Sequence, residues 1–294
     1  MEYLMTYGWA ILIIAIVLVA FFSLNLFNPY TFSPKASPGS CQILRPNGPG
    51  SNLFVSAVGP TCTTNEIPQY VAKFNGYSTL MGTSSTAFVV SQSSVSITGW
   101  VYVAGFTGSN GGSGWWTNPN SLANMGLQVY PNIFPNPTSG AGFWFWLKNQ
   151  SGNTSVCAIN LPVRYNTWYF IAEVTNNTPT GTYNGILYVN GTPSCHFGFV
   201  NPGSEGLPTI GAYGTFYIWD GYLANIQYYN TTLSTSEIQA LHAEGIGGTP
   251  VDIQNLVGWW PLNGNGNDYS GNGNNGVPTN VIFTSNWENG YSSP

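Results

Sequence analysis

The acidic side chains are the first candidates for chemistry, because two carboxylates that flank a sugar linkage can hydrolyse it. The chain has ten Asp and Glu among 294 residues, and they are scattered singly. Glu237 and Glu244 belong to a predicted surface helix. His196 lies beside Cys195, but the sequence supplies no third partner for a nucleophilic triad. We therefore predict no catalytic residue and expect the chain not to be an enzyme.

A second candidate is a calcium loop in residues 263–276, where oxygen-bearing side chains are spaced as ligands. These side chains belong to Asn263, Asn265, Asn267 and Asp268. An EF-hand needs a bidentate Glu at its twelfth position, which Asn274 occupies here. Asn-Gly repeats are also strong turn signals. The run is a weak calcium candidate, with a cluster of turns as the alternative, and we predict no metal and no cofactor.

The four cysteines predict two disulfides, since none belongs to a CxxC pair and they follow an export-type segment. Zinc is the alternative, but the cysteine spacings do not fit it, and His196 and His242 lack ligand-like spacing. Sequence order favours one pairing among three possible connectivities: Cys41 with Cys62, and Cys157 with Cys195.

Five Asn-x-Ser/Thr sequons predict N-glycosylation. Their acceptors are Asn149, Asn153, Asn176, Asn190 and Asn230. A chain rich in Asn, Ser and Thr also generates such motifs by chance. Charged residues make up only 5% of this chain, so glycans would hydrate a surface that has little charge repulsion.

Composition limits what can position these side chains. Aromatic residues reach 15%, which argues against disorder. A net charge of −5 with five basic residues argues against nucleic acid as a partner. Beyond an apolar N-terminal segment and a Pro/Ser linker, roughly 250 residues remain for one large all-β domain or two small ones.

Short runs rich in Val, Ile, Phe, Tyr and Trp, separated by turn residues, predict a β-sandwich. The clearest predicted strands are residues 70–74, 94–103, 142–148, 168–174, 185–189, 223–229 and 281–284. One short helix is predicted after Ser234, which forms a capping box with Glu237, and Gly245 ends it.

The N-terminal residues 1–27 form an apolar segment with a single charge, at Glu2. A helix over residues 3–27 would be about 37 Å long, enough to span a bilayer. A carboxylate at the start of such a helix is costly unless a positive group meets it.

The run EYLMTYGWAIL (2–12) resembles the start of archaeal type IV pilin-like proteins with a class III signal peptide. That resemblance implies a helix that bundles with its copies in a filament core, with Glu2 paired to a neighbour's terminal amine. The family's short basic leader does not precede Met1 here. The residues expected to mediate assembly are Glu2, Tyr3, Leu4, Tyr7, Gly8, Trp9, Ile11, Ile14 and Leu18.

A second resemblance covers roughly residues 70–245 and is to laminin-G-like, concanavalin-type jelly rolls. It is carried by AKFNG (72–76), SITGWV (96–101), TWYFIA (167–172), LYVNG (187–191) and YYNTTLS (228–234), in the family's order. The opening segment of such a domain occurs instead at the back, as LVGWWPLNG (256–264) and DYSGNGNNG (268–276). The order therefore resembles a circular permutation, and we expect residues 256–294 to pair with the rest of the domain. Relatives often carry paired aspartates where this chain has Leu223, Ala224 and Asn225, so the resemblance does not extend to a calcium site there.

These observations predict three regions: an assembly or membrane helix (1–27), a Pro/Ser linker (28–40) and a β-sandwich head (41–294). We expect a structural subunit of an archaeal type IV pilus-like filament on the cell surface, inserted in the membrane before assembly. Its partners would be identical subunits, and the head would bind a glycan or another cell-surface ligand in adhesion. The alternative is a monomeric, membrane-anchored lectin.

Overall fold

The computed structural model divides into two compact units, residues 1–35 and 36–294. The residues that it describes are 13, 42–44, 56–58, 67–77, 80–83, 94–105, 113–114, 116–117, 124–131, 141–148, 154–158, 163–177, 182–200, 209–213 and 217–294. Apart from Ile13, the predicted N-terminal helix with its nine assembly residues lies outside this set, as do the linker 28–40, Cys41, Cys62, Asn149 and Asn153. None of the helices in the described part of the chain is long and apolar enough to cross a bilayer.

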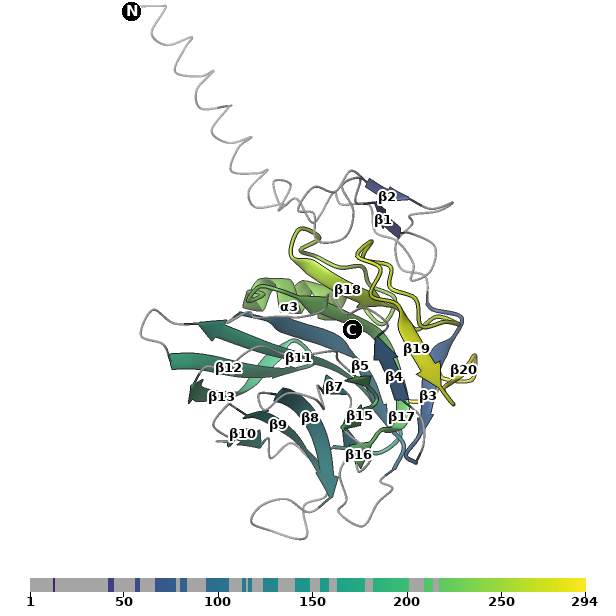
Figure 1. The fold of residues 1–294 in the computed structure, drawn as a ribbon, viewed down its shortest axis with the longest axis horizontal. Helices are drawn as coiled ribbons and strands as arrows, with labels where there is room; N and C mark the ends of the chain where they lie inside the picture. Colours follow the sequence, from purple (N-terminus) through teal and green to yellow (C-terminus); the bar gives the residue numbers. More distant parts are fainter. Residues whose placement is uncertain are drawn as a thin grey trace, which may run out of the picture. The chain divides into compact units, whose positions relative to one another are not determined.

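The largest element is an eight-stranded sheet with the strand order β13-β12-β11-β5-β17-β3-β20, in which β18 also pairs with β17 (Figure 1). Its strands are β3 (Val71–Asn75), β5 (Ser96–Val103), β11 (Trp168–Asn177), β12 (Thr182–Val189), β13 (Thr192–Val200), β17 (Asp220–Tyr229), β18 (Leu256–Trp260) and β20 (Ile282–Thr284). All of these pairings are antiparallel. The strands predicted in this region from apolar alternation are therefore confirmed, with ends that differ by a few residues.

A second layer contains a six-stranded sheet, β10-β9-β8-β6-β16-β15, and a four-stranded sheet, β19-β4-β14-β7. Its strands are β4 (Leu80–Thr83), β6 (Ser113–Gly114), β7 (Trp116–Thr117), β8 (Asn124–Pro131), β9 (Ala141–Lys148), β10 (Thr154–Ala158), β14 (Thr209–Ile210), β15 (Ala212–Tyr213), β16 (Tyr217–Ile218) and β19 (Gly276–Thr279). A further hairpin pairs β1 (Gln42–Leu44) with β2 (Ser56–Val58). The domain is thus mainly β, as predicted.

The core lies between these layers. Phe143 of β9 meets Tyr169 of β11 edge to face, with ring centroids 5.2 Å apart. Both rings belong to one buried cluster with Ile97, Val101 and Ile171. Because successive side chains of a strand point to opposite faces, these odd-numbered residues of β5 and β11 all face the second layer.

The opposite face of the eight-stranded sheet is covered by α3 (Thr235–Ala243) and by the last residues of the chain. Aromatic rings pack on this face. The Trp100 ring stacks on that of His242 of α3, with centroids 5.9 Å apart, and meets the Tyr291 ring edge to face, with centroids 5.4 Å apart. Trp287 is 1% exposed, and its indole donates to Pro68 O at 3.1 Å. The end of the chain therefore forms part of the folded domain.

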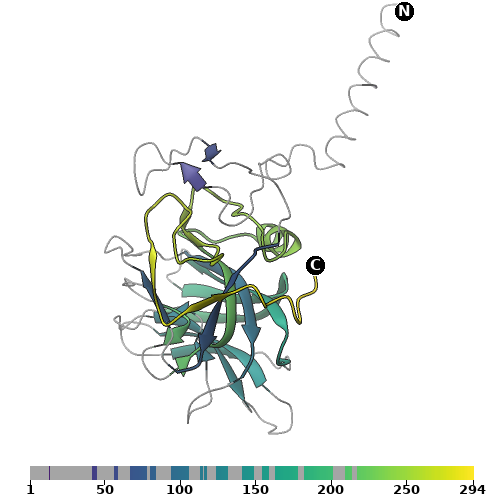
Figure 2. The same cartoon turned by 90° about the vertical axis from the view of Figure 1, so that its right-hand side faces the viewer.

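Residues 256–284 pair with strands from earlier in the chain. β18 lies beside β17, β19 beside β4 and β20 beside β3. Figure 2 shows the yellow C-terminal segment running alongside dark blue β3. Trp259 and Trp260 are both buried, with 1% and 0% exposed. Residues 256–284 therefore complete the edges of sheets formed by earlier strands.

The helix α3 begins as its sequence predicts. Ser234 Oγ accepts a hydrogen bond from the Glu237 amide at 3.3 Å, and Glu237 Oε2 accepts one from the Ser234 amide at 2.8 Å. After the helix, Gly245 has a φ of +78°, the left-handed conformation expected of a stop. Ile238 and Leu241 are the buried side chains that attach α3 to the sheet.

Candidate functional site

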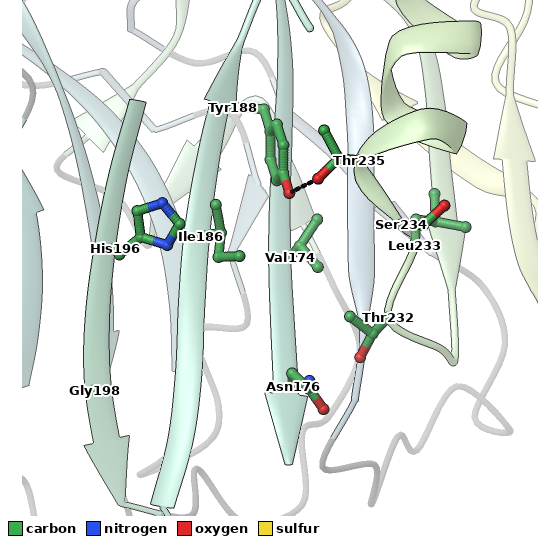
Figure 3. Close-up of a pocket in the computed structure, with 10 residues that line it drawn as sticks. All are labelled: Val174, Asn176, Ile186, Tyr188, His196, Gly198, Thr232, Leu233, Ser234 and Thr235. Carbon is green, nitrogen blue, oxygen red and sulfur yellow. Dashed lines mark hydrogen bonds between the residues drawn. The ribbon is translucent and has the colours of Figure 1, made fainter. Parts of the chain in front are cut away.

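A pocket of about 540 Å³ lies on the outer face of β11, β12 and β13, where the segment 232–235 passes beside the sheet (Figure 3). Strand residues line one side of it, and the segment that leads into α3 lines the other. The lining residues are Val174, Asn176, Ile186, Tyr188, His196, Gly198, Thr232, Leu233, Ser234 and Thr235.

The floor is a cross-strand row. The register places Val174 opposite Ile186, and Ile186 opposite His196, on three neighbouring strands. Val174 is 1% exposed, Ile186 is half-buried and His196 is exposed. The floor is therefore apolar at its centre and carries an imidazole toward the edge strand.

The rim is fixed by hydrogen bonds to the sheet. Thr232 Oγ1 donates to Thr175 O at 2.7 Å. The Ser96 hydroxyl donates to Thr231 O and accepts from the Leu233 amide, both at 2.8 Å. Leu233 is 2% exposed and anchors the segment. These contacts hold the rim in place without a bound ligand.

Two polar side chains of the pocket remain available to a ligand. Tyr188 Oη and Thr235 Oγ1 are 3.0 Å apart and bond to each other. Ser234 Oγ donates to Glu237 Oε2 at 2.7 Å. By contrast, Asn176 and His196 are exposed, and their side chains have no hydrogen bond to another residue in the described part of the chain. Their amide and imidazole offer both donors and acceptors.

Acidic side chains, lysine and arginine are absent from the ten residues that line the pocket. The nearby Glu237 carboxylate is engaged by the amide and hydroxyl of Ser234. The lining therefore offers hydrogen bonds but no carboxylate, lysine or arginine to pair with a charged ligand.

The predicted calcium residues take part in hydrogen bonds within their own loop and with Trp259 and Tyr70. Asp268 is 6% exposed, and its carboxylate accepts bonds from the amides of Trp259, Ser270 and Asn274 at 2.8–2.9 Å. Burial raises the pKa of this carboxyl in spite of these bonds. Asn263 Oδ1 accepts from the Tyr70 amide at 2.8 Å.

The other two predicted calcium residues, Asn265 and Asn267, are joined by a hydrogen bond. Asn265 Oδ1 accepts from the Asn267 amide at 2.9 Å, which closes a local turn. No group of three His, Cys, Asp or Glu that would hold a metal occurs among the described residues. The side-chain oxygens of Asn263, Asn265 and Asp268 thus accept hydrogen bonds from backbone amides, and the calcium candidate stays an untested prediction.

The other predicted residues that the structure describes are three glycan acceptors and two cysteines. Asn190 and Asn230 are exposed at strand ends, whereas the acceptor Asn176 lines the pocket. Cys195, next to His196, is disulfide-bonded. Its strand β13 contacts β10, which carries Cys157, and the pairing of these two cysteines stays a prediction.

The pocket itself was not predicted from the sequence. His196 was weighed only as a catalytic or metal-binding residue, and Asn176 only as a glycan acceptor. Because Thr232 lies 57 positions from the carbonyl that it bonds, nothing local in the sequence indicates that this segment borders β11.

Comparisons with known proteins agree with this architecture. The model of the concanavalin A-like lectin/glucanases superfamily matches residues 75–239, which include every residue that lines the pocket. No curated protein matches the chain. A native heptameric SAP-like pentraxin from Limulus polyphemus aligns with a TM-score of 0.52 and 16% identity, over 75% of this chain and 96% of the pentraxin. A protein from Bacteroides ovatus, described as carbohydrate binding, aligns with a TM-score of 0.54 and 16% identity, over 79% of this chain and 65% of that one.

Proposed function

We propose, from the premise that this chain belongs to the concanavalin A-like lectin/glucanases superfamily, that its head is a non-enzymatic domain which binds neutral glycans in the outer-face pocket. The observation that carries the proposal is a fixed, uncharged pocket with an apolar floor and two available polar side chains. Its volume of about 540 Å³ lies in the range of small-molecule sites.

A sugar fits this arrangement because it has an apolar C–H face and hydroxyls around its edge. Val174 and Ile186 would contact the C–H face, while Asn176 and His196 would bond the hydroxyls. Acidic sugars are disfavoured, since no Lys or Arg lines the site and the chain has a net charge of −5. Hydrolysis is disfavoured too, because no carboxylate lines the pocket and glycosidases use two.

We further propose that the head is displayed on a type IV pilus-like filament. This part rests on the sequence of residues 1–27 alone, whose apolar run begins with Glu2. The alternative is a single membrane anchor carrying the same lectin-like head. Electron micrographs of sheared surface fractions, labelled with an antibody to the head, separate the two: filaments support assembly, and label confined to membrane fragments contradicts it.

Glycan binding is tested by screening the full chain against neutral and acidic oligosaccharides. We expect binding to neutral glycans. His196→Ala should weaken that binding about tenfold, which corresponds to about 1.4 kcal/mol. The control is Tyr77→Ala, because Tyr77 is 73% exposed and lies outside the pocket; it should bind as the parent does. Equal binding by the parent and His196→Ala would overturn the assignment of the site.

A further inference from the structure

One sequon has its acceptor inside the pocket. The described acceptors are Asn176, Asn190 and Asn230. Asn190 occupies the β12–β13 turn with a φ of +50°, and its Oδ1 accepts a bond from the Phe170 amide at 2.9 Å. Asn230 is exposed after β17 but does not line the pocket. Asn176 alone of the three is both exposed and a pocket residue.

Asn176 lies at one end of the pocket, beside its rim. On one side, Thr232 bonds the carbonyl of the preceding residue, Thr175, at 2.7 Å, so the rim stands directly beside it. On the other side, the register pairs Asn176 with Asn184 of β12, and Asn184 with Gly198 of β13. Figure 3 shows Asn176 and Thr232 together at one end of the pocket. Ile186 and His196 line the same pocket, farther from this end.

We propose that an N-linked glycan on Asn176 lies in this pocket and excludes other ligands from it, so that modification masks the site. The effect on binding rests on the proposed function, whereas the placement of the glycan does not. A tethered sugar has an effective concentration in the millimolar range. The tethered sugar would therefore displace any free glycan whose dissociation constant for the pocket is also in the millimolar range.

The probe is the rate at which diethyl pyrocarbonate modifies His196, read by peptide mass spectrometry, because this imidazole lies in the pocket and is exposed. His242 serves as the internal reference, since it lies on α3 outside the pocket. Protein from its native cells is compared with Thr178→Ala, which removes the sequon and keeps Asn176. Asn230→Gln, which removes a sequon outside the pocket, is the matched control.

We expect native protein to carry a glycan on Asn176. Diethyl pyrocarbonate should then modify His196 at least about fivefold more slowly in native protein than in Thr178→Ala. The rate in Asn230→Gln should match that in native protein. An unmodified Asn176 in native protein, or equal His196 rates in native protein and Thr178→Ala, would overturn the proposal. If His196 is modified slowly in native protein but Thr178→Ala binds no glycan, the placement of the glycan is supported and the proposed function is contradicted.

Discussion

Asn225 is the residue whose replacement tests the fold most sharply. It occupies a bulge in β17, with a φ of +51°, and is 4% exposed. Its Nδ2 donates to Gly248 O at 2.7 Å, and its Oδ1 accepts from Gln227 Nε2 at 3.1 Å and Trp259 Nε1 at 2.8 Å. One amide therefore ties the bulge, β18 and the segment after α3 together.

Asn225→Ala would leave three buried polar groups without this partner. Each such group costs about 1–3 kcal/mol, and a non-glycine residue in the left-handed region costs about 1 kcal/mol or more. Allowing for partial relaxation, we expect a loss of about 4–8 kcal/mol in the free energy of unfolding. This is a large part of the 5–15 kcal/mol typical of a domain.

Urea unfolding followed by tryptophan fluorescence measures this loss. The control is Asn280→Ala, since Asn280 also has a positive φ, of +56°, but is exposed. It should lose about 1 kcal/mol, from backbone conformation. If both variants lose the same amount, the hydrogen bonds of Asn225 contribute nothing and the reasoning is refuted.

Three further predictions concern the outer layers. Gly258→Ala should cost about 1–3 kcal/mol, because the added Cβ would collide with the Trp260 ring; an unchanged urea midpoint would contradict this. Trp287→Ala should cost about 3–5 kcal/mol and raise protease cleavage near the C-terminus, whereas resistance equal to the parent's would show that the last residues are dispensable. Burial lowers the pKa of His242 below its ordinary 6.5, so the folded head binds a proton less readily than the unfolded chain does. Its contribution to stability is complete above pH 6.5 and falls as the pH drops below that value; melting temperatures of His242→Gln should show a smaller decline over that range than the parent's.

Much of the sheet was predictable because apolar alternation is a local property. The strands around Val101, Ile171 and Leu223 follow this pattern, and the capping box at Ser234 fixes the start of α3. β13 was not predicted, because Pro193 and Gly198 interrupt its pattern and its placement depends on pairing with β12.

The pocket was harder to predict for a related reason. Its floor requires the register of three strands, and its rim requires a contact between Thr175 and Thr232, 57 positions apart. Similarly, Asn225 was considered only as a replacement for an acidic ligand. Its hydrogen bonds to Trp259 and Gly248 arise from tertiary structure that no local signal reveals.

The bond between Trp287 and Pro68 has a consequence for biogenesis. It joins residues 219 positions apart, and Trp287 lies only seven positions from the end of this sequence. The edge of the sheet at β3 cannot be completed until β20 has emerged from the ribosome. Folding of the head must therefore follow synthesis of the chain through Trp287, and the high sequence separation of its contacts makes that folding slow.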